Sequence, residues 1–353
     1  MSVMEKWLDC HCHVLGGGTE AVLELDRSQR EDYGRCASNF LSVEGMDDAA
    51  QNALGICFKL LNPQNYAFGG LHYRFSYDFG EEARALAEIG FDGIKMIENK
   101  PSERKRLGFR QDDPRYDSLY RTVTELGLPM LIHVNDPAEN WDWDRCSDWA
   151  KAQGYYYGGG DYVRYEQVAA ETVSMLERYP DMRVCLAHLF FMSDDPPRLR
   201  ALMERFPNLW LDITAGTEMY YAFDEAPAVW RQFFLDYADR ILFGTDNCCP
   251  VSEYDRKIAG EINDLERDFL TRTDRFPLWD RCIQGAGLPE TVIRKITHDN
   301  FRRFAGGTPK PLNTQKAAAY LRGRLGNGEY RLSETERDTI QTVLEMLKSR
   351  EIL

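Results

Sequence analysis

Two histidines separated by one residue, His11 and His13, stand in the apolar run Trp7-Leu8-Asp9-Cys10-His11-Cys12-His13 near the start of the chain. Successive side chains of a strand point to opposite faces, so the two imidazoles share one face. Two imidazoles on one face at the end of a strand supply half of a metal site. The motif therefore predicts a metal centre, provided that further ligands converge on it.

Three more polar residues stand where later strands are expected to end. His133, His188 and Asp246 each close a short apolar segment. Buried histidine and aspartate side chains need partners, and a shared metal ion supplies them. We therefore expect these three residues to lie with the first pair at one end of a sheet.

The elements that position these residues are predicted from short apolar segments that alternate with helical stretches. This alternation is typical of parallel βαβ units, and eight strands close a barrel with its active site at their carboxyl ends. We therefore expect an α/β fold of the (β/α)8 TIM barrel type, with a long loop over residues 16–50. The expected strands are 7–13, 55–61, 71–77, 92–97, 130–134, 183–189, 209–214 and 240–245.

Beyond the expected eighth strand the pattern is mostly helical. Residues 289–304 are predicted to form the last barrel helix, and residues 314–325 and 333–347 two further helices. The second of these opens with the capping box Ser333-x-x-Glu336. We expect residues 1–307 to form the barrel and residues 308–353 a helical extension packed on it, because so short a tail has too little core to stand alone.

Composition narrows the functional class. With 353 residues, 43% of them hydrophobic, the chain suits one barrel with additions or two smaller domains. A net charge of −14 without a Lys/Arg-rich run disfavours nucleic-acid and anionic-membrane partners. Neither a signal peptide nor a membrane span is apparent. Nine cysteines without a CxxC motif indicate reduced thiols, so we expect a cytoplasmic protein.

The motifs, taken in order, resemble those of the amidohydrolase superfamily and specifically of its amidohydrolase-2 branch. That branch includes aminocarboxymuconate semialdehyde decarboxylase, other nonoxidative decarboxylases, and several hydrolases and lactonases. The resemblance covers most of residues 7–304 and is specific for the superfamily, although not for one reaction. The matching motifs are Asp9-x-His11-x-His13, Gly93-Ile-Lys95, Ile132-His133, Ala187-His188, Phe243-Gly-Thr-Asp246 and Asn300-Phe-Arg-Arg-Phe304.

The resemblance implies a metal ligand set and two catalytic residues. His11, His13, His133 and Asp246 would bind one divalent ion, Zn²⁺ in first place, with Mn²⁺ or Fe²⁺ as alternatives. His188 would lie near the ion and act on its water or on the substrate, and Asp246 would also transfer a proton. Two structural alternatives stay open, in which His188 only supports the site and Asp246 caps a helix.

Lys95 has two interpretations. In two-metal amidohydrolases a lysine on the fourth strand is carboxylated and bridges the ions. The resemblance to the one-metal branch favours instead an unmodified cation that binds a substrate carboxylate. Lys59 and Arg74 could bind substrate in the same way or cap the barrel, whereas His72 and His298 are expected to be structural.

The connection from Asp136 to Asp161 is expected to form a lid above the site. Loops of this length in compact domains are usually functional or disordered, and large aromatic residues argue against disorder. They could line a pocket for an aromatic or sugar-like ring, with Trp141 as a substrate contact, or join two copies of the chain in a homo-oligomer. The six aromatics are Trp141, Trp143, Trp149, Tyr155, Tyr156 and Tyr157.

These observations favour a metal-dependent hydrolase of a small carboxylated amide, ester or lactone, with a metal-activated water as the nucleophile. The alternative is a metal-dependent nonoxidative decarboxylase of an aromatic or unsaturated carboxylic acid, which would use the same ligands. A third interpretation, a barrel that retains the ligands but only binds or regulates, is disfavoured because no member of the ligand set is missing.

Overall fold

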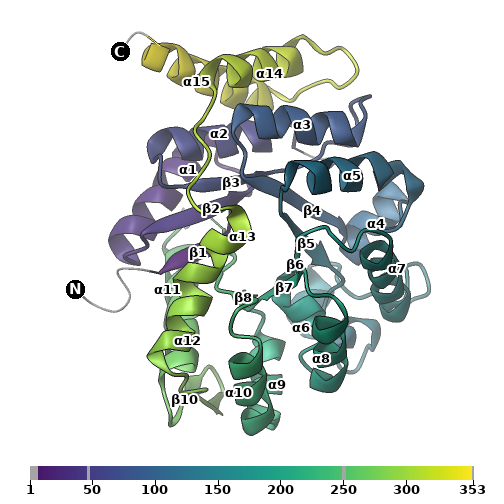
Figure 1. Cartoon of the computed structure of the whole chain (residues 1–353), viewed down its shortest axis with the longest axis vertical. Helices are drawn as coiled ribbons and strands as arrows, with labels where there is room; N and C mark the ends of the chain where they lie inside the picture. The colour runs from purple at the N-terminus through teal and green to yellow at the C-terminus, as the bar shows by residue number, and fades with distance from the viewer. Residues whose placement is uncertain (1–6, 46–47, 249–251, 352–353) are drawn as a thin grey trace.

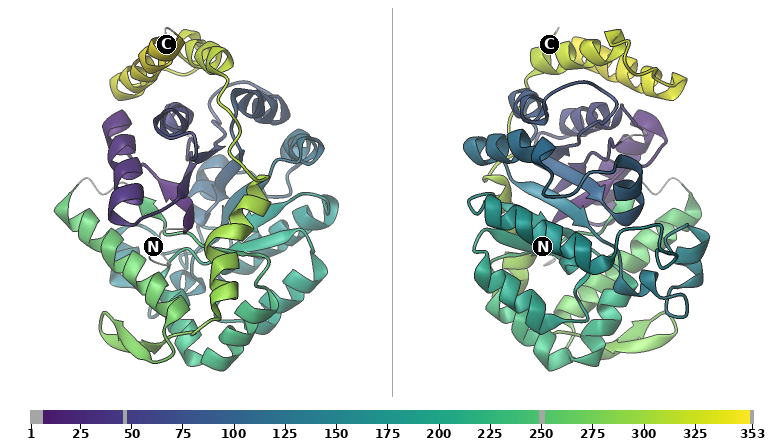
Figure 2. Two further views of the ribbon diagram at one scale, coloured as in Figure 1. Left: turned by 60° about the vertical axis from the view of Figure 1, so that its left-hand side comes forward. Right: turned by 90° about the vertical axis from the view of Figure 1, so that its right-hand side faces the viewer.

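The computed structural model describes residues 7–45, 48–248 and 252–351. Nine parallel strands form one curled sheet in the order β8-β7-β6-β5-β4-β3-β2-β1-β9, with helices around its outside (Figures 1 and 2). The strands are β1 (Leu8–His13), β2 (Ala37–Leu41), β3 (Tyr66–Gly69), β4 (Gly93–Asn99), β5 (Met130–Val134), β6 (Val184–Leu186), β7 (Leu209–Asp212), β8 (Ile241–Leu242) and β9 (Asn247–Cys248).

The sheet closes on itself where the chain leaves β8. The backbone amide of Cys10 donates to the carbonyl of Phe243 at 3.0 Å, and the amide of Asp246 donates to the carbonyl of His11 at 2.9 Å. β9 then continues the pairing with the end of β1. β8 and β9 thus occupy one strand position, and the sheet is a closed barrel, which confirms the expected TIM-barrel fold.

The helices mostly follow the strands along the chain, and the final pair forms a C-terminal extension. The long helices are α1 (Gly18–Arg27), α2 (Gln51–Leu61), α3 (Phe79–Ile89), α5 (Asp117–Leu126), α7 (Tyr165–Arg178), α8 (Pro196–Arg205), α9 (Thr217–Glu225), α10 (Pro227–Asp236), α11 (Glu253–Thr271), α14 (Thr314–Gly326) and α15 (Glu334–Glu351). Shorter ones are η2 (Ser28–Asp32), α4 (Pro101–Leu107), η3 (Pro114–Tyr116), η4 (Ala138–Trp141), α6 (Asp148–Ala152), η5 (Ala187–Phe191), α12 (Glu290–Arg294), η6 (Lys295–Asp299) and α13 (Asn300–Ala305). A hairpin, β10 (Arg275–Leu278) and β11 (Arg281–Gln284), follows α11.

Two of the eight expected strands are wrong. Residues 55–61 belong to α2, and residues 71–77 form turns with one isolated bridge between Gly45 and His72. Every residue from 51 to 60 of α2 is buried, because α1 and α15 also cover this helix. A helix that is apolar on all sides has no helical periodicity in its sequence, so residues 55–61 resemble a buried strand.

The expected loop over residues 16–50 contains two elements, α1 and β2. β2 is fully buried, yet it carries the polar residues Ser38 and Asn39. The Asn39 side-chain amide donates to the carbonyl of Cys10 at 3.0 Å, so its burial is compensated by a hydrogen bond to β1. Such a polar segment lacks the apolar alternation that identifies a strand in a sequence.

The amino-terminal end of the barrel is closed by α13. Phe301 packs edge-on against Tyr66 of β3 with ring centroids 5.1 Å apart, and Phe304 packs against Trp210 of β7 at 5.4 Å. Asn300 donates to the backbone carbonyls of Ala238 and Ile241, both at 2.7 Å. These contacts fill the amino-terminal end of the barrel. Among the described residues, the carboxyl ends of the strands are therefore the side from which a ligand can enter.

The C-terminal extension packs on the outer helices. α15 contacts α1 and α2, and α14 contacts α3 (Figure 1). Arg324 of α14 forms buried ion pairs with Glu82 at 2.8 Å and Glu44 at 3.4 Å. Among the described residues, no helix is both long enough and apolar enough to cross a membrane.

Candidate metal centre

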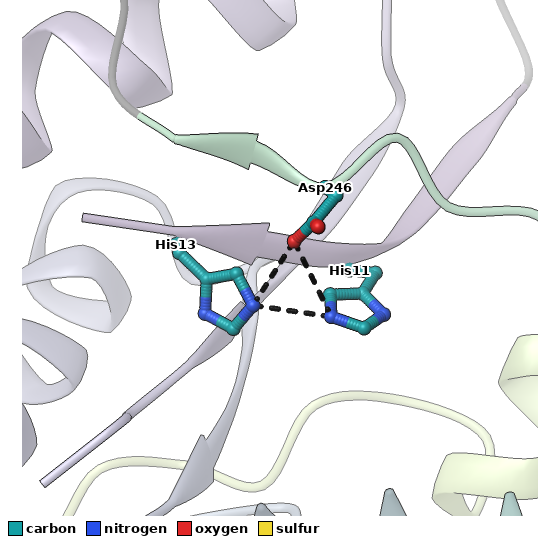
Figure 3. A group of neighbouring side chains, drawn as sticks. All are labelled: His11, His13 and Asp246. Carbon is teal, nitrogen blue, oxygen red and sulfur yellow. Dashed lines mark hydrogen bonds and ion pairs between the residues drawn. The ribbon is translucent and has the colours of Figure 1, made fainter. Parts of the chain in front are cut away.

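Three predicted ligands meet at the carboxyl end of β1. His13 Nε2 lies 3.1 Å from His11 Nε2 and 3.2 Å from Asp246 Oδ1, and His11 Nε2 lies 3.6 Å from Asp246 Oδ1 (Figure 3). Ligand atoms about 2.1 Å from one tetrahedral ion lie about 3.4 Å apart. Within the described residues, this is the one group of His, Cys, Asp or Glu side chains close enough to share an ion.

Both imidazoles present a lone pair to this group. His11 Nδ1 lies 2.9 Å from Asp212 Oδ2, and His13 Nδ1 lies 2.9 Å from the carbonyl of Leu41. A carbonyl and an ionised carboxylate only accept hydrogen bonds, so each Nδ1 carries the hydrogen and each Nε2 is an acceptor. Two lone pairs and a carboxylate oxygen repel one another at these distances unless a cation lies between them. The donor set therefore fits a metal ion.

The backbone around Asp246 directs its carboxylate to the histidines. Asp246 has a φ of 55°, in the left-handed region that aspartate tolerates better than most residues. Asp9 fixes the preceding residue, because its carboxylate accepts from the amide of Thr245 at 3.1 Å and from its hydroxyl at 2.6 Å. The first residue of the Asp-x-His-x-His motif thus aligns β1 with the segment that carries Asp246.

The protonation state of His11 also suits metal binding, which requires neutral imidazoles. Burial, and then the charge of Lys95, lower the pKa of His11 well below its usual value.

His188 lies beside the ligands with one ring nitrogen unused. It belongs to η5, directly after β6, and its φ is 54°. Its Nδ1 lies 3.1 Å from the carbonyl of Thr214, so Nδ1 carries the hydrogen. Its Nε2 is buried and has no hydrogen-bond partner among the described residues. A buried acceptor without a partner at a cavity marks a place for a ligand group.

His133 lies next to His188 but outside the group of three. The two rings are 4.9 Å apart, and His133 Nε2 is 3.0 Å from the carbonyl of Asn135 and 3.5 Å from Asp136 Oδ1. Burial lowers the pKa of His133 to about 3. Its role as a fourth ligand stays a prediction.

Asp212, at the end of β7, is a site residue that the sequence analysis missed. One carboxylate oxygen accepts from His11 Nδ1, and the other accepts from the amide of His188 at 2.7 Å. Asp212 thus orients one ligand and the neighbouring histidine together. The signal was present, because Asp212 closes the apolar run Leu209-Trp-Leu just as Asp246 closes its own.

The three predicted substrate-binding residues lie in different surroundings. Lys95 is buried, its Nζ is 3.3 Å from His11 Nε2, and burial lowers its pKa. Arg74 lies over the ring of Tyr330 at 5.3 Å, toward the C-terminal extension. Trp141 donates from Nε1 to the carbonyl of Val163 at 3.0 Å. None of the three lines the cavity described next, so their roles stay predictions.

A cavity of about 450 Å³ opens above the ligands. Asp246, His188 and His133 lie at its base. The lid loop contributes Trp149 and Tyr155, so two of the six aromatics expected there do face this space. Another part of the cavity lining comes from α9, α11 and the β10–β11 hairpin, and its residues were not predicted from the sequence. Its side chains include Glu218, Tyr221, Ile258, Leu265, Leu278 and Trp279.

The family model for amidohydrolase, that of the amidohydrolase-2 family, matches residues 79–306, which is more than half of the chain. The chain belongs to the amidohydrolase-2 family. The match confirms the resemblance seen in the motifs and places the His-His-Asp group in a family of metal-dependent enzymes that act on small molecules. A comparison with curated protein sequences gives no match.

Solved structures with the same fold include enzymes of more than one reaction type. 4-Oxalomesaconate hydratase from Rhodopseudomonas palustris has a TM-score of 0.52 and 14% identity, over 91% of this amidohydrolase and 100% of that chain. 2,6-Dihydroxybenzoate decarboxylase, complexed with 2,6-dihydroxybenzoate, has a TM-score of 0.51 and 15% identity, over 86% and 100%. 5-Carboxyvanillate decarboxylase from Novosphingobium aromaticivorans, complexed with manganese, has a TM-score of 0.50 and 12% identity, over 87% and 99%. At these identities the likeness shows the fold.

Proposed function

We propose that this member of the amidohydrolase-2 family is a metal-dependent nonoxidative decarboxylase of a small aromatic or unsaturated carboxylic acid. The observation that carries the proposal is the cavity, which is lined by Asp246 of the ligand group and by the rings of Trp149, Tyr155, Phe191, Tyr221 and Trp279. A volume of about 450 Å³, with aromatic and aliphatic side chains in part of its lining, suits one substituted ring.

This proposal reverses the order of preference from the sequence, which favoured hydrolysis of a carboxylated amide, ester or lactone. Two of the three solved structures named above are decarboxylases of ring acids. Hydrolysis remains the second candidate because His188 Nε2 is an acceptor without a partner and could take a proton from an attacking water.

The residues of this chain can divide the work of decarboxylation. A bound divalent ion supplies positive charge at the base of the cavity, which stabilises negative charge on substrate oxygens. The bond between the ring carbon and the carboxylate breaks, CO₂ leaves, and the ring carbon takes a proton. His188 can hold that proton at Nε2 while Thr214 and Asp212 keep the imidazole in place. The aromatic side chains of the lining orient the ring.

The metal is proposed to be Zn²⁺ or Mn²⁺, because two imidazole nitrogens and a carboxylate oxygen suit both ions.

The decisive experiment incubates the metal-loaded protein in D₂O with hydroxybenzoic acids, aminobenzoic acids, lactones and N-acyl amino acids. We expect CO₂ from a ring acid, with one deuterium on the vacated carbon, and no CO₂ from the His188→Ala variant. Acid release from a lactone or amide without CO₂ would establish the hydrolase instead.

A further inference from the structure

The charges that line the cavity are mostly negative. Lys100 is the one lysine or arginine among the described lining residues, and both carboxylate oxygens of Asp136 lie 2.7 Å from its Nζ. The other charged lining residues are the carboxylates of Glu139, Glu218, Asp246 and Glu261. Away from the ligand group, the described residues of the cavity therefore provide no unpaired cation for a second substrate carboxylate.

Glu218 differs from the other acidic residues of the lining. Glu139 pairs with Arg145 at 3.2 Å, and Glu261 has Lys257 at 3.7 Å. Asp246 belongs to the ligand group. The carboxylate of Glu218 accepts from its own backbone amide, and no described side chain makes a hydrogen bond or ion pair with it. Removal from bulk water raises its pKa. The Glu218 carboxylate thus has no cationic partner among the described side chains, and its remaining acceptor capacity is available to a ligand.

The local backbone holds the Glu218 carboxylate at the cavity wall. Glu218 is the second residue of α9, and its carboxylate folds back over Gly216, which also lines the cavity. A Cβ atom at position 216 would overlap both carboxylate oxygens, so the glycine makes room for them. Alanine at this position would displace the carboxylate without removing it.

A second acceptor faces the same space. His188 is 5% exposed, and its Nε2 has no hydrogen-bond partner among the described residues. Glu218 and His188 Nε2 are thus two hydrogen-bond acceptors of the cavity, and the described lining provides no unpaired cation beside them. A substrate must therefore bring hydrogen-bond donors to these two acceptors.

We propose that Glu218 sets substrate specificity by accepting a hydrogen bond from an amino or hydroxyl substituent of the ring. The preferred substrate is a ring acid with one carboxylate and one such donor, and a dicarboxylate is rejected. The inference rests on the proposed function only in placing the substrate carboxylate at the ligand group. A hydrogen bond to a charged acceptor changes affinity by about tenfold or more.

The test measures binding without turnover, by quenching of tryptophan fluorescence in metal-loaded protein with benzoate, 3-aminobenzoate, 3-hydroxybenzoate and isophthalate. We expect both donor-bearing acids to bind about tenfold more tightly than benzoate, and isophthalate to bind more weakly than benzoate. Glu218→Gln and Gly216→Ala should each reduce the preference for the donor-bearing acids and improve isophthalate binding. Glu225→Gln, an exposed change on the same helix, should leave the order unchanged.

The outcomes separate the two proposals. Isophthalate binding as tight as that of 3-aminobenzoate, or a preference that is undiminished in Glu218→Gln, would overturn the role of Glu218 even if the protein releases CO₂. A donor preference that depends on Glu218, in a protein that releases no CO₂ from any ring acid, supports the specificity proposal and overturns only the proposed reaction.

Discussion

Asp212 shows how one carboxylate can control two histidines of the site at once. It accepts from His11 Nδ1 through one oxygen and from the backbone amide of His188 through the other. An asparagine of the same shape can keep only one acceptor oxygen, and its amide group cannot accept from a ring N–H. The carboxylate therefore determines the tautomer of His11 as well as its orientation.

We predict that Asp212→Asn lowers metal affinity by about 10- to 100-fold, because His11 loses the partner that fixes its Nε2 as an acceptor. Titration of metal-free protein with Zn²⁺ measures the change. Asp239→Asn, an exposed carboxylate on the barrel exterior, is the matched control. Equal affinities of Asp212→Asn and the unaltered protein would contradict the assignment.

The ligand role of His133 is the next prediction. His133→Ala should lower the bound metal from about one equivalent, as His11→Ala should, because a catalytic site commonly takes three protein ligands or more. Elemental analysis of the purified variants measures this. His298→Ala, a histidine paired with Asp299 outside the cavity, serves as the control. Full metal content in His133→Ala would reduce the ligand set to His11, His13 and Asp246.

Glu98, near the end of β4, is expected to make the unfolding free energy of the barrel depend on pH. Burial raises the pKa of Glu98 to about 7 from its usual value of 4.5. A raised pKa means that the folded state binds the proton more tightly, so stability is full below about pH 4.5 and falls as the pH rises toward 7.

We predict that Glu98→Gln removes this dependence. Between pH 5 and pH 8 the unaltered protein should lose up to about 3 kcal/mol of unfolding free energy relative to the variant. Urea denaturation of metal-loaded protein at several pH values measures the difference. Glu125→Gln, an exposed change, should run parallel to the unaltered protein, and a parallel curve for Glu98→Gln would disprove the prediction.

At the scale of elements, the sequence predicted best where a strand shows its own pattern. Residues 130–134 were expected as a strand and form β5 with the same bounds. α2 was mistaken for a strand because its burial on all sides depends on α15, far along the chain. β2 was missed because Ser38 and Asn39 are buried by pairing with β1 and β3, not by apolar character.

The same distinction holds for the site. His11, His13, His188 and Asp246 close apolar runs, so their place at the carboxyl end of the barrel was predictable. Glu218 and Trp279 reach the cavity from α9 and the β10–β11 hairpin. The sequences of α9 and the hairpin do not indicate which side of the barrel these elements pack on, because tertiary contacts decide it.

The lid loop contributes unequally to the cavity, and this yields a prediction at the element scale. Both Trp149 and Trp143 are exposed, but Trp149 lines the cavity, whereas Trp143 packs edge-on against Tyr156 and is not among the lining residues. Trp149→Ala should weaken binding of a ring acid by about five- to tenfold, since one aromatic contact is worth about 0.5–1.5 kcal/mol. Fluorescence titration measures this, and Trp143→Ala is the control. An equal loss in both variants would contradict a specific role for Trp149.

At the scale of the molecule, the C-terminal extension is tied to the metal centre through the segment that follows β2. The Leu41 carbonyl holds His13 Nδ1, and a few residues later the amide of Ala49 donates to Glu336 of α15 at 2.8 Å. Arg324 of α14 reaches Glu44 in the same segment. The extension lies outside residues 79–306, so this support is separate from the family's matched region.

Arg324→Ala should therefore affect both stability and the site. Removing the guanidinium leaves Glu82 and Glu44 buried without their shared cation, which we expect to lower the unfolding free energy by about 3–5 kcal/mol. Arg322→Ala, an exposed change two residues away, should lower it by no more than about 0.5 kcal/mol. Urea denaturation measures both variants, and a Zn²⁺ titration under native conditions then reports on His13.

A weakened Zn²⁺ affinity in folded Arg324→Ala would show that the extension supports the ligand, because the substituted residue lies outside the ligand group. Unchanged stability would show that the buried pairs add nothing to the fold, and unchanged Zn²⁺ affinity in a destabilised variant would confine the extension to a structural role.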